Sequence, residues 1–173
     1  ETTEESEFVF MIPSNYYDCR YAVLRRPLGF ARGAELLGDD NEAIHSFIEI
    51  EKEVVAVGRA HLIPADSDGS AADHAGPGAK KCPGFGLLVT GNNRPAIQIR
   101  QMGTLPTNRR KGFAAQVLSS LEATSKEKFG ARFGFLQARE PAIEFYQSQG
   151  WQLVDDPYII EGIGPHRSMM KAL

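Results

Sequence analysis

Three consecutive cations, Arg109, Arg110 and Lys111, stand directly before Gly112 in this sequence. Residues 96–104 before them alternate apolar and polar side chains as in a strand, and residues 113–121 after them show the apolar spacing of a helix. A helix start carries partial positive charge, so cations there are unfavourable unless an anion binds. Free amides, a glycine and guanidinium groups together favour phosphate. We therefore predict a phosphate site, although a cationic triplet by itself is more often solvated surface.

The elements around this site can be placed from the same stretch. Residues 105–108 predict a turn, because Pro106 lacks an amide donor and Asn108 can cap a helix that opens on the three cations. The helix should close at Phe129 and Gly130, since glycine is the usual left-handed cap. Residues 131–138 should then form a strand parallel to the first, as in other strand-helix-strand crossovers.

These residues resemble the cofactor signature of the GCN5-related N-acetyltransferase (GNAT) superfamily. Residues 109–114 match its Arg/Gln-x-x-Gly-x-Gly/Ala motif, and residues 102–106 stand where the family has a strand end of the type Met-Ala-Val-x-Pro. Arg110 stands where glycine is frequent, and Thr104 where valine is. The resemblance implies acetyl-CoA as cofactor. It implies an acyl-arm site at Met102, Gly103 and Thr104 and a pyrophosphate site at Arg109, Arg110, Lys111, Gly112, Phe113 and Ala114.

Further segments follow in the order of the ElaA-like subgroup of this family. Residues 23–29 resemble its Val-Leu-Arg-x-Pro-Leu-Gly segment, and residues 58–62 resemble the run that forms the family's third strand. Residues 142–151 resemble its Ala-x-x-Phe-Tyr-x-x-x-Gly-Phe motif, and residues 161–166 its Glu-x-Gly-Ile-Pro-His segment with one extra glycine. The resemblance implies the GNAT α/β fold: a mixed, twisted sheet with helices on both faces and acetyl-CoA where two central strands part.

Acetyl transfer to an amine needs a base, an oxyanion donor and a proton for the departing thiolate. In the resembled family a tyrosine at the position of Tyr146 supplies that proton, so Tyr146 is our candidate acid; a packed aromatic is the alternative. His166 is the candidate base because the unperturbed pKa of histidine is about 6.5. A histidine that only bonds a backbone carbonyl is the alternative there. A backbone amide near residues 102–104 could bind the oxyanion.

The remaining elements complete a single domain over residues 1–173. Residues 8–12 and 84–90 predict short strands, residues 16–26 a helix, and residues 43–51 and 54–63 an antiparallel hairpin. His61 on that hairpin is assigned no role. Residues 64–83 are rich in Asp, Ser, Gly and Ala and predict a flexible loop, either a lid or an insertion without function.

Composition excludes several classes of protein. A chain of 173 residues with 42% hydrophobic composition predicts one domain, and a net charge of -3 argues against a nucleic-acid binder. Cys19 and Cys82 have no partner ligands at metal-binding spacing, so we predict free thiols and no metal. No apolar run approaches the ~20 residues of a membrane helix, and the acidic start is unlike a signal peptide. We expect a cytoplasmic protein without a membrane partner.

The predicted function is transfer of an acetyl group from acetyl-CoA to a primary amine of a small molecule or peptide. The alternative is a non-catalytic acyl-CoA-binding or sensing module, which the lack of a glutamate on strand 96–104 favours. A nucleoside-triphosphate site is excluded because its Gly-x-x-x-x-Gly-Lys-Ser/Thr motif is missing. Asp39, Asp40 and Glu42 could attract a cationic amine or form a solvated turn. The oligomeric state is open, with a homodimer as one option.

Overall fold

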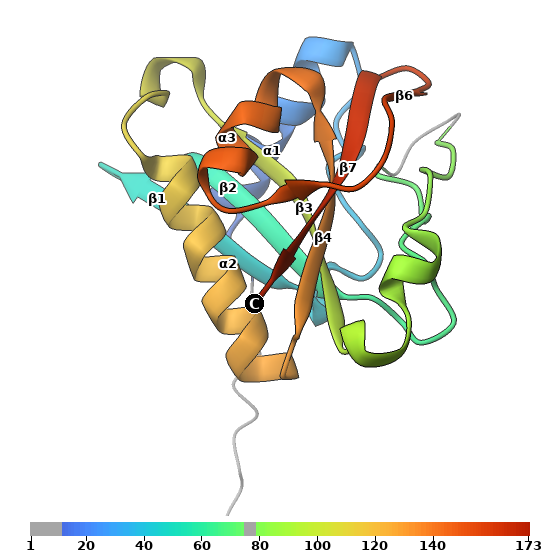
Figure 1. The fold of residues 1–173 in the computed structure, drawn as a ribbon. Helices are drawn as coiled ribbons and strands as arrows, with labels where there is room; N and C mark the ends of the chain where they lie inside the picture. Colours follow the sequence, from blue (N-terminus) through green and yellow to red (C-terminus); the bar gives the residue numbers. More distant parts are fainter. Residues whose placement is uncertain (1–11, 75–78) are drawn as a thin grey trace, which may run out of the picture.

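The structure, a computed structural model, describes residues 12–74 and 79–173 and contains a seven-stranded mixed sheet (Figure 1). The strand order is β1-β2-β3-β4-β7-β5, and β6 pairs with β7. The pair β3–β4 is parallel and the other pairs are antiparallel. The strands are β1 (Ile44–Ile50), β2 (Glu53–Leu62), β3 (Ala96–Thr104), β4 (Phe133–Arg139), β5 (Gln152–Leu153), β6 (Tyr158–Ile160) and β7 (Gly164–Ala172), and the helices are α1 (Ser14–Leu24), α2 (Phe113–Phe129) and α3 (Ile143–Ser148). This confirms the predicted α/β fold and the parallel β3–α2–β4 unit.

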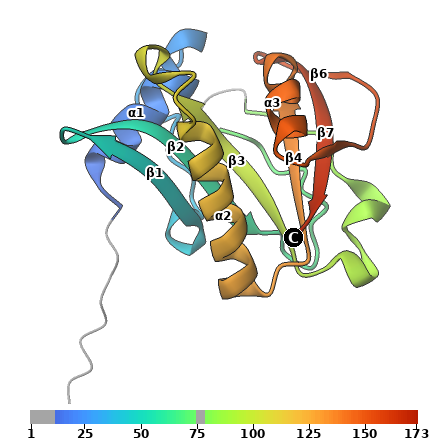
Figure 2. The same ribbon diagram turned by 60° about the vertical axis from the view of Figure 1, so that its left-hand side comes forward.

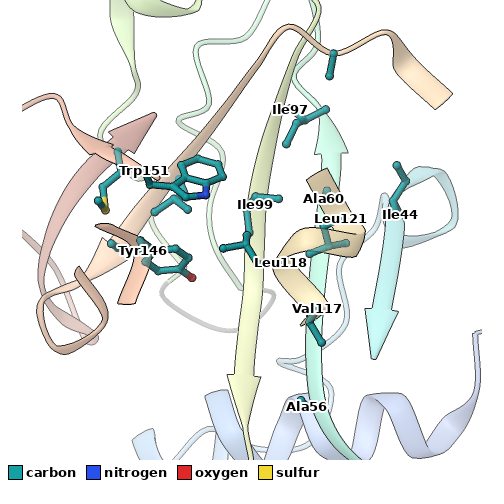
Figure 3. Close-up of a cluster of buried hydrophobic side chains, with 14 residues drawn as sticks. Ile44, Ala56, Ala60, Ile97, Ile99, Val117, Leu118, Leu121, Tyr146 and Trp151 are labelled. Atoms are coloured by element: carbon teal, nitrogen blue, oxygen red, sulfur yellow. The ribbon is translucent and has the colours of Figure 1, made fainter. Parts of the chain in front are cut away.

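Helices cover both faces of the sheet, as predicted (Figure 2). On β2, Ala56 and Ala60 belong to the core beneath α2, whereas Val57 packs with residues of α1. Alternate residues of a strand point to opposite faces, so α1 and α2 lie on opposite sides of β2. Figure 3 shows the α2 side, where Val117, Leu118 and Leu121 contact the strands.

The β1–β2 hairpin is antiparallel, as predicted. Its turn residues Glu51 and Lys52 have φ values of 49° and 69°. Two successive residues with positive φ form a tight turn whose twist matches the twist of the strands. On its other edge β2 pairs antiparallel with β3, which is the central strand of the site.

The predicted start of α2 at the cations is wrong. The helix begins at Phe113, its N-cap is Gly112 at φ 80°, and no side chain caps it. The side chain of Asn108 instead accepts a hydrogen bond from the Thr107 hydroxyl, at 3.0 Å. The three cations therefore lie in the loop before the helix, and their charges do not occupy its first turn. The other end is as predicted, because Gly130 at φ 62° caps it.

Two short predicted strands and one helix boundary also need correction. Residues 84–90 hold a 3-10 turn, Gly86–Val89, instead of a strand. Gly86 and Gly91 have φ values of 58° and 55°, which an extended strand does not allow. Residues 8–11 of the other predicted strand lie outside the described residues, and Ile12 belongs to no strand. Helix α1 ends at Leu24, two residues before the predicted end.

The described residues of the segment 64–83 contain no helix or strand, as predicted for a loop. Its backbone is bound by buried side chains of β3, which the sequence did not reveal. Arg100 donates to the carbonyl oxygens of Ala71 and Ala72, at 2.6 and 3.1 Å, and Gln98 donates to that of Gly69, at 3.2 Å. These side chains alternate with Ile97 and Ile99 beneath α2, so the loop covers the face opposite α2.

Candidate active site

The central strands β3 and β4 separate towards the ends of the parallel pair. They pair only from Ala96 with Phe133 to Gln98 with Phe135. Further along β3 the register with β2 shifts, and Gln101 has a φ of 58°, which together mark a bulge. In the described pairing, the edge of β3 that faces β4 therefore has no strand partner beyond Gln98. This is the opening that the family resemblance led us to expect.

A cavity of about 660 Å³ lies at this opening, between the ends of β3 and β4, α1 and α3. A second cavity of about 280 Å³ lies beside it at the start of α2. The cofactor residues implied by the resemblance that line the first cavity are Met102, Gly103, Thr104, Arg109, Arg110 and Ala114. Gly112 and Phe113 line the second, and Lys111 lines neither. The structure thus brings eight of these residues to one continuous region.

Two backbone features shape this region. A side chain at Gly103 would place its Cβ 2.4 Å from Cγ2 of Val23, so glycine lets α1 lie against the end of β3. Arg110 has a φ of 62°, in the left-handed region where only glycine is free of strain. Arginine at this position therefore costs about 1 kcal/mol of strain.

A smaller cavity of about 90 Å³ lies deeper between the separated strands. His166 of β7 and Tyr146 of α3, the two candidate catalytic residues, both line it. The residues that line both this cavity and the 660 Å³ cavity are Leu24, Met102, Arg139, Ala142 and Tyr146. The deeper cavity, which we call the acceptor cavity, is therefore adjacent to the region of the cofactor residues.

His166 is held in one tautomer by its own strand. The residue is 3% exposed, and its Nδ1 lies 2.8 Å from the carbonyl oxygen of Gly164. A carbonyl can only accept, so Nδ1 carries the proton and Nε2 keeps a free lone pair. Burial lowers the pKa of His166 below its ordinary value of 6.5. The ring is therefore neutral at pH 7, and the carbonyl bond proposed as an alternative to a catalytic role leaves Nε2 available as a base.

Tyr146 lies beside Trp151 at the edge of the core under α2 (Figure 3). It is 7% exposed, and burial raises the pKa of its hydroxyl above 10. The hydroxyl consequently stays protonated at neutral pH, as a general acid must. Trp151 is fixed by a hydrogen bond of 3.1 Å to the carboxylate of Glu122, which supports the position of α3.

In the acidic turn at residues 39–42, Asp39 and Glu42 are exposed, but Asp40 has a structural role that neither sequence interpretation anticipated. Asp40 is 3% exposed and accepts hydrogen bonds from Arg20, at 2.9 Å, and Arg59, at 2.8 Å. It therefore neither faces solvent nor is free to bind an amine. His61 accepts a hydrogen bond from Arg59 at 3.0 Å and lines neither cavity, in agreement with its having been assigned no role.

Four charged residues of the acceptor cavity were missed by the sequence analysis: Arg25, Asp73, Arg100 and Arg139. Arg139 had a usable signal, because ligands of α/β sheets bind outside the carboxyl ends of parallel strands and Arg139 ends β4. Asp73 lies in the loop 64–83, whose position no local pattern predicts. Cys82 also lines the cavity and, like Cys19, is a buried free thiol, as predicted.

Comparisons with known proteins agree with this geometry. Residues 78–154 match the family described as acetyltransferase (GNAT) domain. Similar folds occur in Escherichia coli ElaA (20% identity, TM-score 0.59, 91% of this chain and 88% of that chain) and an acyl-CoA N-acyltransferase from Pseudomonas aeruginosa (16%, 0.62, 92% and 89%). A GNAT family acetyltransferase from Elizabethkingia anophelis with acetyl-CoA bound is also similar (12%, 0.55, 100% and 95%). A comparison with curated proteins gives no match.

The family match and the fold together confirm the resemblance to the GNAT superfamily, and the matched family is one of acetyltransferases. At these identities, the similar structures show the fold alone. Within residues 12–74 and 79–173, no helix has both the length and the apolar character needed to cross a membrane.

Proposed function

We propose that this protein transfers an acetyl group from acetyl-CoA to a primary amine by direct attack of the amine on the thioester. The proposal depends mainly on one observation. At the gap between β3 and β4, the cavity lined by Arg109, Arg110 and Ala114 adjoins the cavity lined by His166 and Tyr146. A small-molecule or peptide amine stays the predicted acceptor, and the cytoplasmic location and the homodimer stay predictions.

The residues at the opening fit acetyl-CoA. Arg109 and Arg110 are exposed and line the 660 Å³ cavity, where their guanidinium groups would meet phosphate oxygens. Phe145 of α3 and Val23 of α1 supply apolar walls suited to the pantetheine arm. Bound acetyl-CoA would supply the acyl group in activated form, as a thioester.

The residues of the chain divide the proton transfers between them. Nε2 of His166 takes a proton from the amine, because its lone pair is free and the ring is neutral at pH 7. The backbone amides on the free edge of β3 donate to the oxygen on which charge develops. The Tyr146 hydroxyl gives its proton to the departing sulfur. Because a thiol has a pKa near ~8.5, this last transfer needs the least assistance.

Binding of acetyl-CoA should raise the unfolding temperature of the protein. At about 100 times the dissociation constant, the ligand should add about 2.7 kcal/mol to the free energy of unfolding. The double variant Arg109→Ala/Arg110→Ala should show a smaller shift at the same concentration, because two phosphate-binding groups are lost. The control Lys126→Ala/Lys128→Ala removes two exposed cations at the far end of α2 and should keep the full shift. Equal shifts in both double variants would contradict the proposed phosphate site.

Replacing Tyr146 with phenylalanine should lower kcat for thiol release roughly tenfold, because the thiolate is already a fair leaving group. The acetyl-CoA-induced shift in unfolding temperature should persist, since the ring and its packing remain. An unchanged kcat would show that Tyr146 is only a packed aromatic.

A sensing module, the second candidate function, would bind acetyl-CoA with the same shift in unfolding temperature but release no thiol with any amine.

A further inference from the structure

The acceptor cavity has an excess of positive charge. Three arginines, Arg25, Arg100 and Arg139, line it, and Asp73 is its only carboxylate within the described part of the chain. Asp73 lies 4.0 Å from Arg25 and 3.9 Å from Arg100, so one carboxylate is shared between two guanidinium groups. The lining therefore favours an anionic group in the bound ligand.

Arg25 and Arg100 have most of their donors occupied by neutral groups. Arg25 donates to the Asp73 carbonyl oxygen at 2.7 Å and to the Gln101 side chain at 3.0 Å. Arg100 donates to carbonyl oxygens of the loop 64–83. Carbonyl oxygens satisfy hydrogen bonds but bring no negative charge. These two residues thus hold the loop in place and still contribute positive charge to the cavity.

Arg139 differs from both. Within the residues that the structure describes, its guanidinium group makes no hydrogen bond and no ion pair, although the side chain is only partly exposed. An arginine has five N–H donors in a planar fork that matches a carboxylate. A half-buried guanidinium without a partner at a cavity wall is the feature expected of a binding group whose partner belongs to the ligand.

The position of Arg139 relates it to the candidate base. Arg139 of β4 pairs directly with His166 of β7. Side chains directly opposite each other on antiparallel strands lie on the same face, close together. Both residues line the acceptor cavity with Tyr146. A molecule with its amine at Nε2 of His166 would thus bring a nearby acidic group to Arg139.

We propose that the acceptor is an amino acid or a closely similar compound with a carboxylate near its amine, and that Arg139 binds this carboxylate. This inference rests on the proposed function, because it names the substrate class of the same site. A cavity of about 90 Å³ suits a small compound, and the direct pairing of Arg139 with His166 suits a short distance between its two groups. Arg139 is then a specificity-determining residue that directs the amine towards His166.

The test compares acids with their amides. Thiol release and the unfolding temperature in the presence of CoA are measured with glycine, alanine, β-alanine and phenylalanine, each beside its carboxamide. Amidation removes the carboxylate and lowers the pKa of the amine, so chemistry without recognition would favour the amides. We expect the wild-type protein to prefer at least one acid by about tenfold to a hundredfold in kcat/KM, as loss of a charged hydrogen-bonded pair implies.

Three variants test whether Arg139 causes the preference for acids over amides. Arg139→Gln should abolish it while leaving the KM for acetyl-CoA within about twofold, and Arg139→Lys should retain part of it. The control Arg132→Gln removes an exposed arginine that bonds the Asn92 carbonyl outside the cavity and should keep the preference. A raised KM for acetyl-CoA in Arg139→Gln, with the acid preference intact, would show that Arg139 binds the cofactor and would overturn the proposal.

The two measurements separate this inference from the proposed function. Thiol release at equal rates with acids and amides would contradict the carboxylate site but support the acetyltransferase activity. If no compound released thiol but the acids alone stabilised the protein, the carboxylate site would stand and the acetyltransferase activity would be contradicted. Stabilisation and turnover without any preference for an acid would overturn the inference.

Discussion

Replacing His166 with asparagine should lower kcat for thiol release by about a hundredfold to ten-thousandfold, the usual contribution of a general base. Asparagine can still donate to the Gly164 carbonyl, which His166 does from Nδ1 at 2.8 Å. It has no basic nitrogen to replace Nε2, so the variant isolates the proton transfer from the local hydrogen bond. The measurement is kcat at saturating acetyl-CoA with the best amine of a panel.

The pH dependence gives an independent readout. Burial lowers the pKa of His166 below 6.5, so the ring stays neutral, and active as a base, at and above pH 6.5. Activity of the wild-type protein should fall only as the pH drops below that value, because the ring then becomes protonated. His166→Asn should lose this acid limb together with the rate.

The control for His166 is His61→Asn. Burial and the charge of Arg59 lower the pKa of His61 to about 3, so it too is neutral, but it lies outside both cavities. Its replacement should leave kcat and the acid limb unchanged. If His166→Asn keeps both its rate and its acid limb, the base must be another group, and the Gly164 bond is then the whole role of His166.

Replacing Asp40 with asparagine should destabilise the protein by about 3–5 kcal/mol, the usual cost of leaving buried charges without their partner. The side chains of Arg20 and Asp40 are 0% and 4% exposed, and that of Arg59 is 1% exposed. Asp40 is the ion-pair partner of Arg20 and one of two partners of Arg59, which also pairs with Asp39. The Asp40 carboxylate also accepts from the Leu37 amide at 3.0 Å. Urea unfolding of the wild-type and variant proteins measures the difference.

The control is Glu42→Gln, which removes an exposed carboxylate from the same 3-10 turn and should change stability by less than about 0.5 kcal/mol.

Burial by itself would raise the pKa of Asp40, but Arg20, the Leu37 amide and Arg59 together lower it below 3.8. A depressed pKa stabilises the folded state above the unfolded value, and this stability is lost as the pH falls through the folded value. The difference between wild-type protein and Asp40→Asn should therefore be largest near neutral pH and shrink in acid. A difference below 1 kcal/mol at pH 7 would contradict this role.

Local patterns were sufficient where one element could be recognised from its own residues. The alternation in β3 and the helical spacing in α2 predicted both elements, because the side-chain period follows directly from the backbone geometry. Gly130 was recognised as the cap of α2 because glycine readily adopts the left-handed conformation that ends a helix. The start of α2 was misplaced, since the left-handed conformations of Arg110 and Gly112 form a loop that charge and spacing do not encode.

Part of the candidate site could likewise be found from the sequence, and part only from the fold. The cofactor residues are nearly contiguous, so the family motif could point to them together before any fold was known. His166 and Arg139 became neighbours only through the β4–β7 pairing, which joins segments that are 27 residues apart in the chain.

By itself, the sequence determined the order of the main elements, the family resemblance and the candidate residues Tyr146 and His166. The tertiary structure alone decided which charges are available to a ligand. Asp40 reads as a surface carboxylate in the sequence but is buried between two arginines. Arg139 reads as an ordinary strand end but lines both cavities without a partner among the described residues. The physical reason is that the burial and pairing of a charge depend on groups distant in sequence, whereas periodicity and turn chemistry are local.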